Sequence, residues 1–100
     1  MSERVLRLRR RYIRLAPYPE DLGAEQVWES VRGLFTTLYG LVGLADSGLK
    51  LLKTREGLVL ACYHRWVPEV VAAITLVDNV AGRPASLDIV KISGSVRGVR

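Results

Sequence analysis

Guanidinium groups crowd the first fourteen residues of this 100-residue chain. Six arginines face a single acid there, Glu3, and they are Arg4, Arg7, Arg9, Arg10, Arg11 and Arg14. The whole chain has 15 bases and 10 acids, so residues 15–100 carry nine of each and add nothing to the net charge of +5. A fixed cluster of cations suits a polyanion, and RNA or DNA is the first candidate. A solvated basic arm that only aids solubility is the plainer alternative.

Cys62 and His64 are the other side chains whose types could do chemistry. They lie two residues apart, so on a strand they share one face. A cysteine beside a histidine can form a nucleophilic pair. We favour a buried thiol with an imidazole nearby over a catalytic pair.

The acidic residues do not form an obvious metal site. Asp46, Asp78 and Asp88 lie in three different segments, and the chain has only one cysteine and one histidine. Metal sites usually draw several such ligands together, and no P-loop or G-x-G-x-x-G occurs. We expect no catalytic residue, no metal site and no cofactor bound by the protein.

Length and composition predict one folded domain. Hydrophobic residues make up 49% of the chain and charged residues 25%, which is ordinary for a globular protein. We expect a basic arm over residues 1–9 and a single domain over residues 10–100. No apolar run approaches the roughly 18 residues that cross a bilayer, and no apolar stretch follows the basic start. We therefore expect no secretory signal and no membrane contact.

The use of individual residue types hints at compartment and source. One cysteine fits a reducing compartment, so we expect a cytoplasmic protein. Asn, Gln, Cys and Met occur once each, which favours a heat-adapted organism. The chain also holds twelve arginines against three lysines, a bias that a GC-rich genome alone would give.

Hydrophobic periodicity predicts six elements. Period-two alternation indicates strands over residues 10–15, 49–53, 58–65 and 86–92. Helical spacing indicates one helix over 25–39, which Gly40 ends, and a second over 68–81, which Gly82 ends. Pro17 and Pro19 should terminate the first strand. Residues 41–48 are then a connection between the first helix and the second strand.

The order β-α-β-β-α-β predicts an α+β, ferredoxin-like fold. In this split β-α-β sandwich, four antiparallel strands carry both helices on one face, as in the RNA-recognition motif. The first and third strands are neighbours at the sheet centre. Arg10, Tyr12 and Arg14 should point away from the helices, as should Tyr63 and Arg65. Tyrosines among arginines suit the stacking of bases and the neutralisation of phosphates, although the tyrosines could simply cover the sheet.

Three better-known classes on similar folds fit less well. The third strand lacks the glycine and alternating aromatics of an RNA-recognition motif. Gly40-Leu41-Val42-Gly43 matches the G-x-x-G loop of KH domains, but its apolar middle pair disfavours phosphate contact. Acylphosphatases need a glycine-rich anion loop with an arginine after the first strand, whereas residues 16–21 are acidic and contain two prolines.

Four stretches together resemble the archaeal ribonuclease P protein component 2 family, whose eukaryotic relatives also serve ribonuclease MRP. The stretches are Arg10-Arg11-Tyr12-Ile13, residues 38–45 with the pattern L-x-G-x-x-G-x-A, the second helix over Val67 to Gly82, and Ile92-Ser93-Gly94-Ser95-Val96-Arg97. The likeness spans about residues 10 to 98. Ser95 replaces the usual threonine, which keeps a hydroxyl group there.

This resemblance implies a role in a ribonucleoprotein enzyme. Ribonuclease P removes the 5′ leader of precursor tRNA, and its RNA performs the hydrolysis with bound Mg²⁺. A protein of this family is expected to lack an active site, to bind the ribonuclease P RNA, and to pair with component 3, a TIM-barrel subunit. Precursor tRNA would be contacted indirectly, and self-association is left open. The expected RNA-binding residues are Arg7, Arg9, Arg10, Arg11, Tyr12, Arg14, Tyr63, Arg65 and Arg97.

Two other hypotheses stay open at this point. The chain could be a protein-interaction module without a direct role in RNA binding, with Trp28 or Trp66 on a docking surface rather than in the core. It could also be a small acyl-phosphate or small-molecule enzyme, with His64 or Arg14 in the reaction.

Overall fold

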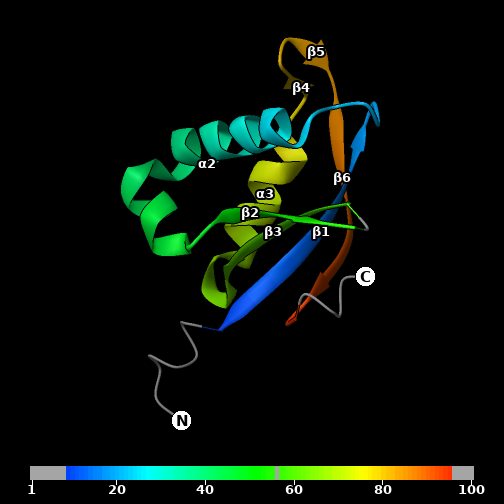
Figure 1. Cartoon of the computed structure of the whole chain (residues 1–100). Coiled ribbons are helices and arrows are strands. Elements are labelled where there is room, and N and C mark those ends of the chain that lie inside the picture. Colours follow the sequence, from blue (N-terminus) through cyan, green and yellow to red (C-terminus); the bar gives the residue numbers. More distant parts are fainter. Residues whose placement is uncertain (1–8, 56, 96–100) are drawn as a thin grey trace.

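The structure is a computed structural model that describes residues 9–55 and 57–95. It follows the predicted order of elements and adds a 3₁₀ turn and a small hairpin (Figure 1). The elements are β1 (Arg10–Tyr18), α2 (Ala24–Ser47), β2 (Lys50–Thr54), β3 (Gly57–Tyr63), η1 (His64–Trp66), α3 (Val67–Leu76), β4 (Asn79–Val80), β5 (Arg83–Pro84) and β6 (Ser86–Ser93).

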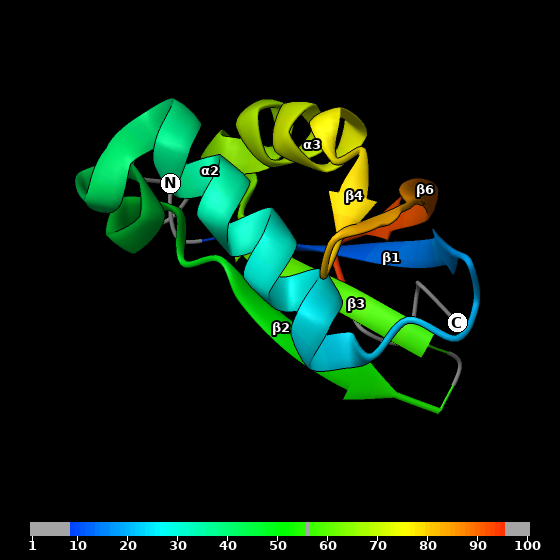
Figure 2. The same cartoon turned by 90° about the horizontal axis from the view of Figure 1, so that it is seen from above.

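The main sheet has the order β2-β3-β1-β6, with every neighbouring pair antiparallel. Both helices cover the same face of this sheet (Figure 2). The core lies between them and includes Ile13, Leu15, Phe35, Leu60 and Ile74. This arrangement confirms the predicted ferredoxin-like α+β fold, and β1 and β3 are indeed adjacent at its centre.

β1 is longer than the sequence predicts, because Pro17 does not end it. β3 pairs with β1 only as far as Leu15, whereas β6 continues to pair as far as Tyr18. Past Leu15, β1 has no pairing partner among residues 57–63 of β3, so the edge of β1 toward these residues is unpaired. A proline is tolerated at such an edge, where a missing N–H group costs no ladder hydrogen bond.

Gly40 interrupts the first helix as predicted, but the chain does not leave the helix there for good. Its φ of 79° and ψ of 173° belong to a region that is essentially open only to glycine. Residues 41–47 then resume helical structure, and Gly48 ends α2 in the left-handed conformation. The prediction of a loop over 41–48 was wrong, because glycine produced a bend where a stop was expected.

The second arm of the bent helix packs over Trp66. A Cβ atom added to Gly43 would lie 3.3 Å from the Trp66 ring, so glycine is what permits this approach. The Trp66 indole N–H donates to Asp46 of the same arm at 2.7 Å. Phe35 and Tyr39 complete an aromatic cluster, with ring centroids 4.8 Å apart. Trp66 and Trp28 both pack against the core, which argues against a docking role for either.

β3 ends at Tyr63, two residues before the predicted end. Arg10, the first residue of β1, pairs with Tyr63, so β3 has no partner on that side beyond this point. The chain turns through η1 into α3, and one backbone bond from His64 N–H to the Arg9 carbonyl closes the turn.

The second helix also ends early, at Leu76 rather than near Gly82. Val77 is already extended, with ψ of 119°. Residues 79–84 form the β4–β5 hairpin, whose turn at Ala81 and Gly82 has positive φ at both positions. Gly82 favours such a turn over a helix, because glycine adopts positive φ without steric cost, and Val80 is buried in the core from the hairpin.

None of the helices in the described part of the chain is long and apolar enough to cross a bilayer.

Candidate nucleic-acid interface

Strand register places a line of cations on the face of the sheet opposite the helices. Arg10, Tyr12 and Arg14 alternate with the core residues Ile13 and Leu15 along β1. Directly paired residues share a face in an antiparallel sheet. The face is made up of Arg10, Tyr12, Arg14, Ala16 and Tyr18 of β1, Val59, Ala61 and Tyr63 of β3, Lys50 and Leu52 of β2, and Ser86, Asp88, Lys91 and Ser93 of β6, so the Asp88 carboxylate lies on it with the cations. We call this set the open face.

The middle of the open face is filled rather than hollow. Val59 and Ala61 are buried although neither belongs to the core beneath the helices. Larger side chains flank them in register, Tyr12 and Arg14 on β1 and Leu52 on β2. The small residues of β3 thus form a floor, and the side chains of β1 stand above it.

Tyr63 lies at one end of the open face and has neighbours of its own. The Arg10 guanidinium carbon lies 5.1 Å from the centre of its ring, within the range of a cation–π contact. A Cβ atom added to Gly48 would lie only 2.7 Å from the same ring. These contacts fix the ring and hold Arg10 on the sheet. Tyr63 therefore positions a cation and is only half-buried.

Lys50 and Lys91 are cations that the sequence interpretation missed. Lys91 pairs with Arg14 across β1 and β6, and Lys50 pairs with Ala61 across β2 and β3. Both lysines are exposed. Alternation along 49–53 could have found Lys50, which falls between Leu49 and Leu51 on a predicted strand. Alternation along 86–92 would instead group Lys91 with the core residues Leu87 and Ile89, and the register shift between Arg14 and Leu15 is what turns Lys91 to the open face.

Three cations on the helix side and in the loops form ion pairs with carboxylates. Ion pairs among the described residues join Arg32 to Glu29 at 2.8 Å, Lys53 to Glu25 at 2.8 Å and Arg83 to Asp21 at 3.3 Å. Within residues 9–55 and 57–95, neither Arg10 nor Lys91 belongs to such a pair. The charge of these two residues is thus not cancelled by acids from the helices.

Several other predicted RNA-binding residues lie elsewhere. Arg11 pairs with Cys62, a core residue, so it faces the helix side, and its guanidinium group donates to the Arg10 carbonyl at 3.1 Å. Arg9 precedes β1 and is exposed. Arg65 is exposed in η1 rather than on β3, so its predicted place on the strand was wrong. Arg7 and Arg97 lie outside the described residues.

Cys62 and His64 lie in different environments in the structure. Cys62 is fully buried on β3, whereas His64 is exposed in η1 because the strand has ended before it. Burial, with a smaller contribution from the Glu69 carboxylate, raises the pKa of the Cys62 thiol to about 11. A nucleophilic thiol requires a lowered pKa, so this geometry does not form a catalytic pair.

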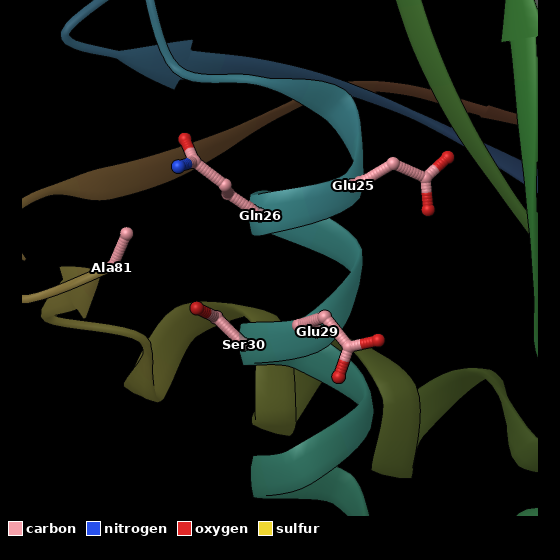
Figure 3. A pocket seen from close by; sticks show the side chains of 5 residues that line it. All are labelled: Glu25, Gln26, Glu29, Ser30 and Ala81. Carbon is pink, nitrogen blue, oxygen red and sulfur yellow. The ribbon is translucent and has the colours of Figure 1, made fainter.

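The hollow beside the start of α2 offers no reactive cluster either. Glu25, Gln26, Glu29, Ser30 and Ala81 line it. Figure 3 shows the two carboxylates pointing away from Ala81, and both are already engaged, with Lys53 and Arg32. The Gln26 side chain accepts the Gly23 N–H at 3.3 Å. Over the described residues, no group of three or more His, Cys, Asp or Glu could hold a metal ion.

Comparison with known families decides what kind of protein carries this face. A family model described as the Rpp14/Pop5 family matches residues 5–100. The chain belongs to the Rpp14/Pop5 family. Membership places it among the protein subunits of the ribonuclease P and ribonuclease MRP ribonucleoproteins. The resemblance found in the sequence is confirmed at this level.

A solved structure shares the fold of this Rpp14/Pop5 family member. A chain in the cryo-EM structure of yeast ribonuclease MRP superposes with a TM-score of 0.62 at 15% sequence identity, over 88% of this chain and 76% of that chain. At this identity the likeness shows the fold alone. A search of the curated proteins found no match.

Proposed function

We propose that this Rpp14/Pop5 family member binds and stabilises the catalytic RNA of ribonuclease P during removal of the 5′ leader from precursor tRNA. The RNA performs the hydrolysis with its own Mg²⁺, and the protein supplies positive charge on an ordered surface. Cations that neutralise phosphates let RNA segments approach one another and lower the Mg²⁺ concentration that the fold needs. The protein takes no part in bond cleavage.

The observation that carries this proposal is the open face in a chain of this family. Arg10, Arg14, Lys50 and Lys91 stand on strands of one rigid sheet, and Tyr12 lies among them. A cation held on a strand loses less entropy on binding than one in a flexible tail. The cations of the open face are spread over several strands, as the charges of a phosphate backbone are spread along RNA. The pockets among the described residues offer no comparable match to a small substrate.

A second surface supports contact with other protein subunits. Leu38, Leu41 and Val42 flank the bend at Gly40, and they are 43%, 74% and 84% exposed. We call these three residues the apolar bend. Exposed aliphatic side chains grouped at one site are typical of a protein-binding surface. We propose that a protein subunit of the ribonucleoprotein covers it, component 3 being the first candidate and a second copy of the chain the other.

Reconstitution tests the proposed function directly. Precursor-tRNA cleavage is measured with ribonuclease P RNA and its other protein subunits, with and without this chain, over a series of Mg²⁺ concentrations. Adding the chain should shift the Mg²⁺ requirement to lower concentration. A chain with Arg10, Arg14 and Lys91 replaced by alanine should restore less of this shift than a chain with Arg32 and Arg83 replaced. An identical Mg²⁺ dependence with and without the wild-type chain would refute the proposal.

The apolar bend also favours a second candidate function, that of a protein-interaction module with no direct RNA contact. Both candidates allow co-purification with another subunit after nuclease treatment at high salt, so the open-face variants in the cleavage assay are what distinguishes them. A module of this kind would still co-purify with another subunit, and its open-face variants would behave like the wild type in the cleavage assay.

A further inference from the structure

A cavity of about 420 Å³ lies beside the open face and has no role in the proposal above. It sits at the edge of β1 past Leu15, next to the start of β3 and the segment that leads into α2. We call it the notch. Its walls include Leu15, Pro17, Leu22 and Leu58, and the charged side chains that the described residues bring to it are Arg14 and Glu20.

The notch exists because two strands of different length flank β1. Pairing with β3 stops at Leu15, while pairing with β6 runs on to Tyr18. Three of its lining residues are small, since Gly57 has no side chain and Ala16 and Ala24 contribute only methyl groups. Nothing larger from the described residues closes it.

Arg14 joins the notch to the open face. It lines the notch and pairs in register with Lys91, so two cations stand at the same end of the sheet. Glu20, on the other hand, brings an exposed carboxylate to the notch. A phosphate is favoured near the two cations and disfavoured near Glu20.

These features define the chemistry of an occupant. Its body must be apolar on its faces to lie against leucine and proline. The edge of the occupant that faces Glu20 must donate a hydrogen bond, because an ionised carboxylate only accepts. An unstacked nucleobase has apolar faces and a polar edge, and single-stranded RNA is commonly read by splaying such a base into a protein site.

We infer that the notch receives an unstacked base with an exocyclic amino group, cytosine among the pyrimidines, from an RNA strand whose phosphates lie on Arg14 and Lys91. The inference rests on the proposed RNA-binding function and adds a base preference to it. The cytosine N4 amino group donates to carboxylates, whereas uracil presents a carbonyl oxygen at the equivalent place, which the Glu20 carboxylate repels.

The test compares two RNAs that differ only at this edge. Fluorescence anisotropy measures binding of the full chain to short labelled oligocytidine and oligouridine of equal length, at neutral pH. The wild-type chain should prefer oligocytidine by about fivefold or more. Glu20→Gln should abolish the preference, because an amide can donate to the uracil oxygen.

A second variant fills the notch and keeps its charges. Ala16→Leu should lower the affinity for oligocytidine to that for oligouridine, whereas Ala45→Leu, the same change at an exposed position on α2, should not. Thermal melting followed by circular dichroism checks that each variant folds.

The outcomes separate this inference from the proposed function. The inference that the notch binds a base would be refuted by equal affinity of the wild type for both RNAs. An undiminished preference for oligocytidine in both notch variants would refute it as well. If Arg14→Ala with Lys91→Ala nevertheless loses affinity for both RNAs, the open face stands as the RNA surface. A wild-type chain that binds neither RNA also refutes base binding in the notch, and the cleavage assay then tests the proposed function by itself.

Discussion

The face of the sheet on which a cation lies determines whether that cation is placed to contact RNA. Arg10 and Arg11 are adjacent in the sequence, yet Arg10 stands on the open face above Tyr63 while Arg11 faces the helix side opposite Cys62. Two equal charges one residue apart thus have different access to an RNA. Charge counting alone treats them as equivalent.

Salt dependence measures the contribution of each cation. Replacing Arg10, Arg14 or Lys91 by alanine should make the plot of log affinity for ribonuclease P RNA against log salt shallower by roughly 0.7 to 0.9 for each phosphate that is no longer neutralised. Arg32→Ala and Arg83→Ala remove the same charge from residues already paired with Glu29 and Asp21. A slope change as large in these controls would mean that net charge, not the open face, governs binding.

The buried thiol makes a prediction about pH. The pKa of Cys62 is raised from its ordinary value of 9.0 to about 11 in the folded protein, first by burial and then by the Glu69 carboxylate. A raised pKa gives stability that is fully present below the unfolded value and is lost as pH rises through the folded one. The wild type should therefore lose more stability than Cys62→Ala between about pH 9 and pH 11.

Denaturant unfolding at several pH values checks this, since other groups that titrate there are common to both proteins. Parallel pH profiles for the two proteins would contradict the burial argument.

Among the elements, the bent helix α2 depends on glycine in two distinct ways. Gly40 supplies a backbone conformation that other residues avoid, and Gly43 supplies space for Trp66. The first produces the bend and the second lets the arm beyond it close on the core. The apolar bend is exposed as a consequence of both.

Two glycine-to-alanine substitutions in α2 distinguish the effect of limited space around a side chain from the effect of helix propensity. A Cβ atom at Gly43 would lie 2.9 Å from the Tyr39 Cβ, closer than real contacts allow, so Gly43→Ala should destabilise the protein by about 1 to 3 kcal/mol. Nothing lies within 4 Å of a Cβ atom at Gly33 in the same helix, so Gly33→Ala should stabilise it by about 0.5 to 1 kcal/mol. Denaturant unfolding gives both values, and a stabilising Gly43→Ala would contradict the close packing.

At the scale of the whole molecule, the two candidate surfaces lie on different elements. The open face belongs to the sheet strands, and the apolar bend belongs to α2 on the opposite side of that sheet (Figure 2). One subunit could therefore hold RNA and protein at the same time without competition between them.

This separation predicts independent effects. Replacing Leu41 and Val42 by serine should weaken association with the partner subunit and leave RNA affinity and the melting temperature nearly unchanged, since both side chains are exposed. Replacing Arg10 and Arg14 by alanine should do the reverse. Pull-down with the partner and anisotropy with RNA measure the two effects. Loss of both activities from either pair of changes would show that the surfaces are not separate.

The sequence by itself determined the order of the elements and the outward face of β1. Alternation and helical spacing depend on local burial, which each segment carries in its own residues. The sequence alone also showed the concentration of positive charge before residue 15 and the resemblance to a known family. Arg10, Tyr12 and Arg14 were correctly placed on this basis.

Only the tertiary structure decided which other cations lie on the open face with Arg10 and Arg14, and which predicted ones do not. Lys91 reaches the open face because the register of β6 on β1 shifts between Arg14 and Leu15, a long-range property that no local pattern contains. Arg65 lies outside β3 because pairing of β3 with β1 stops at Tyr63, and Pro17 belongs to β1 because β6 still pairs with it. The notch depends on the same unequal strand lengths, which are set by pairing between segments far apart in the chain.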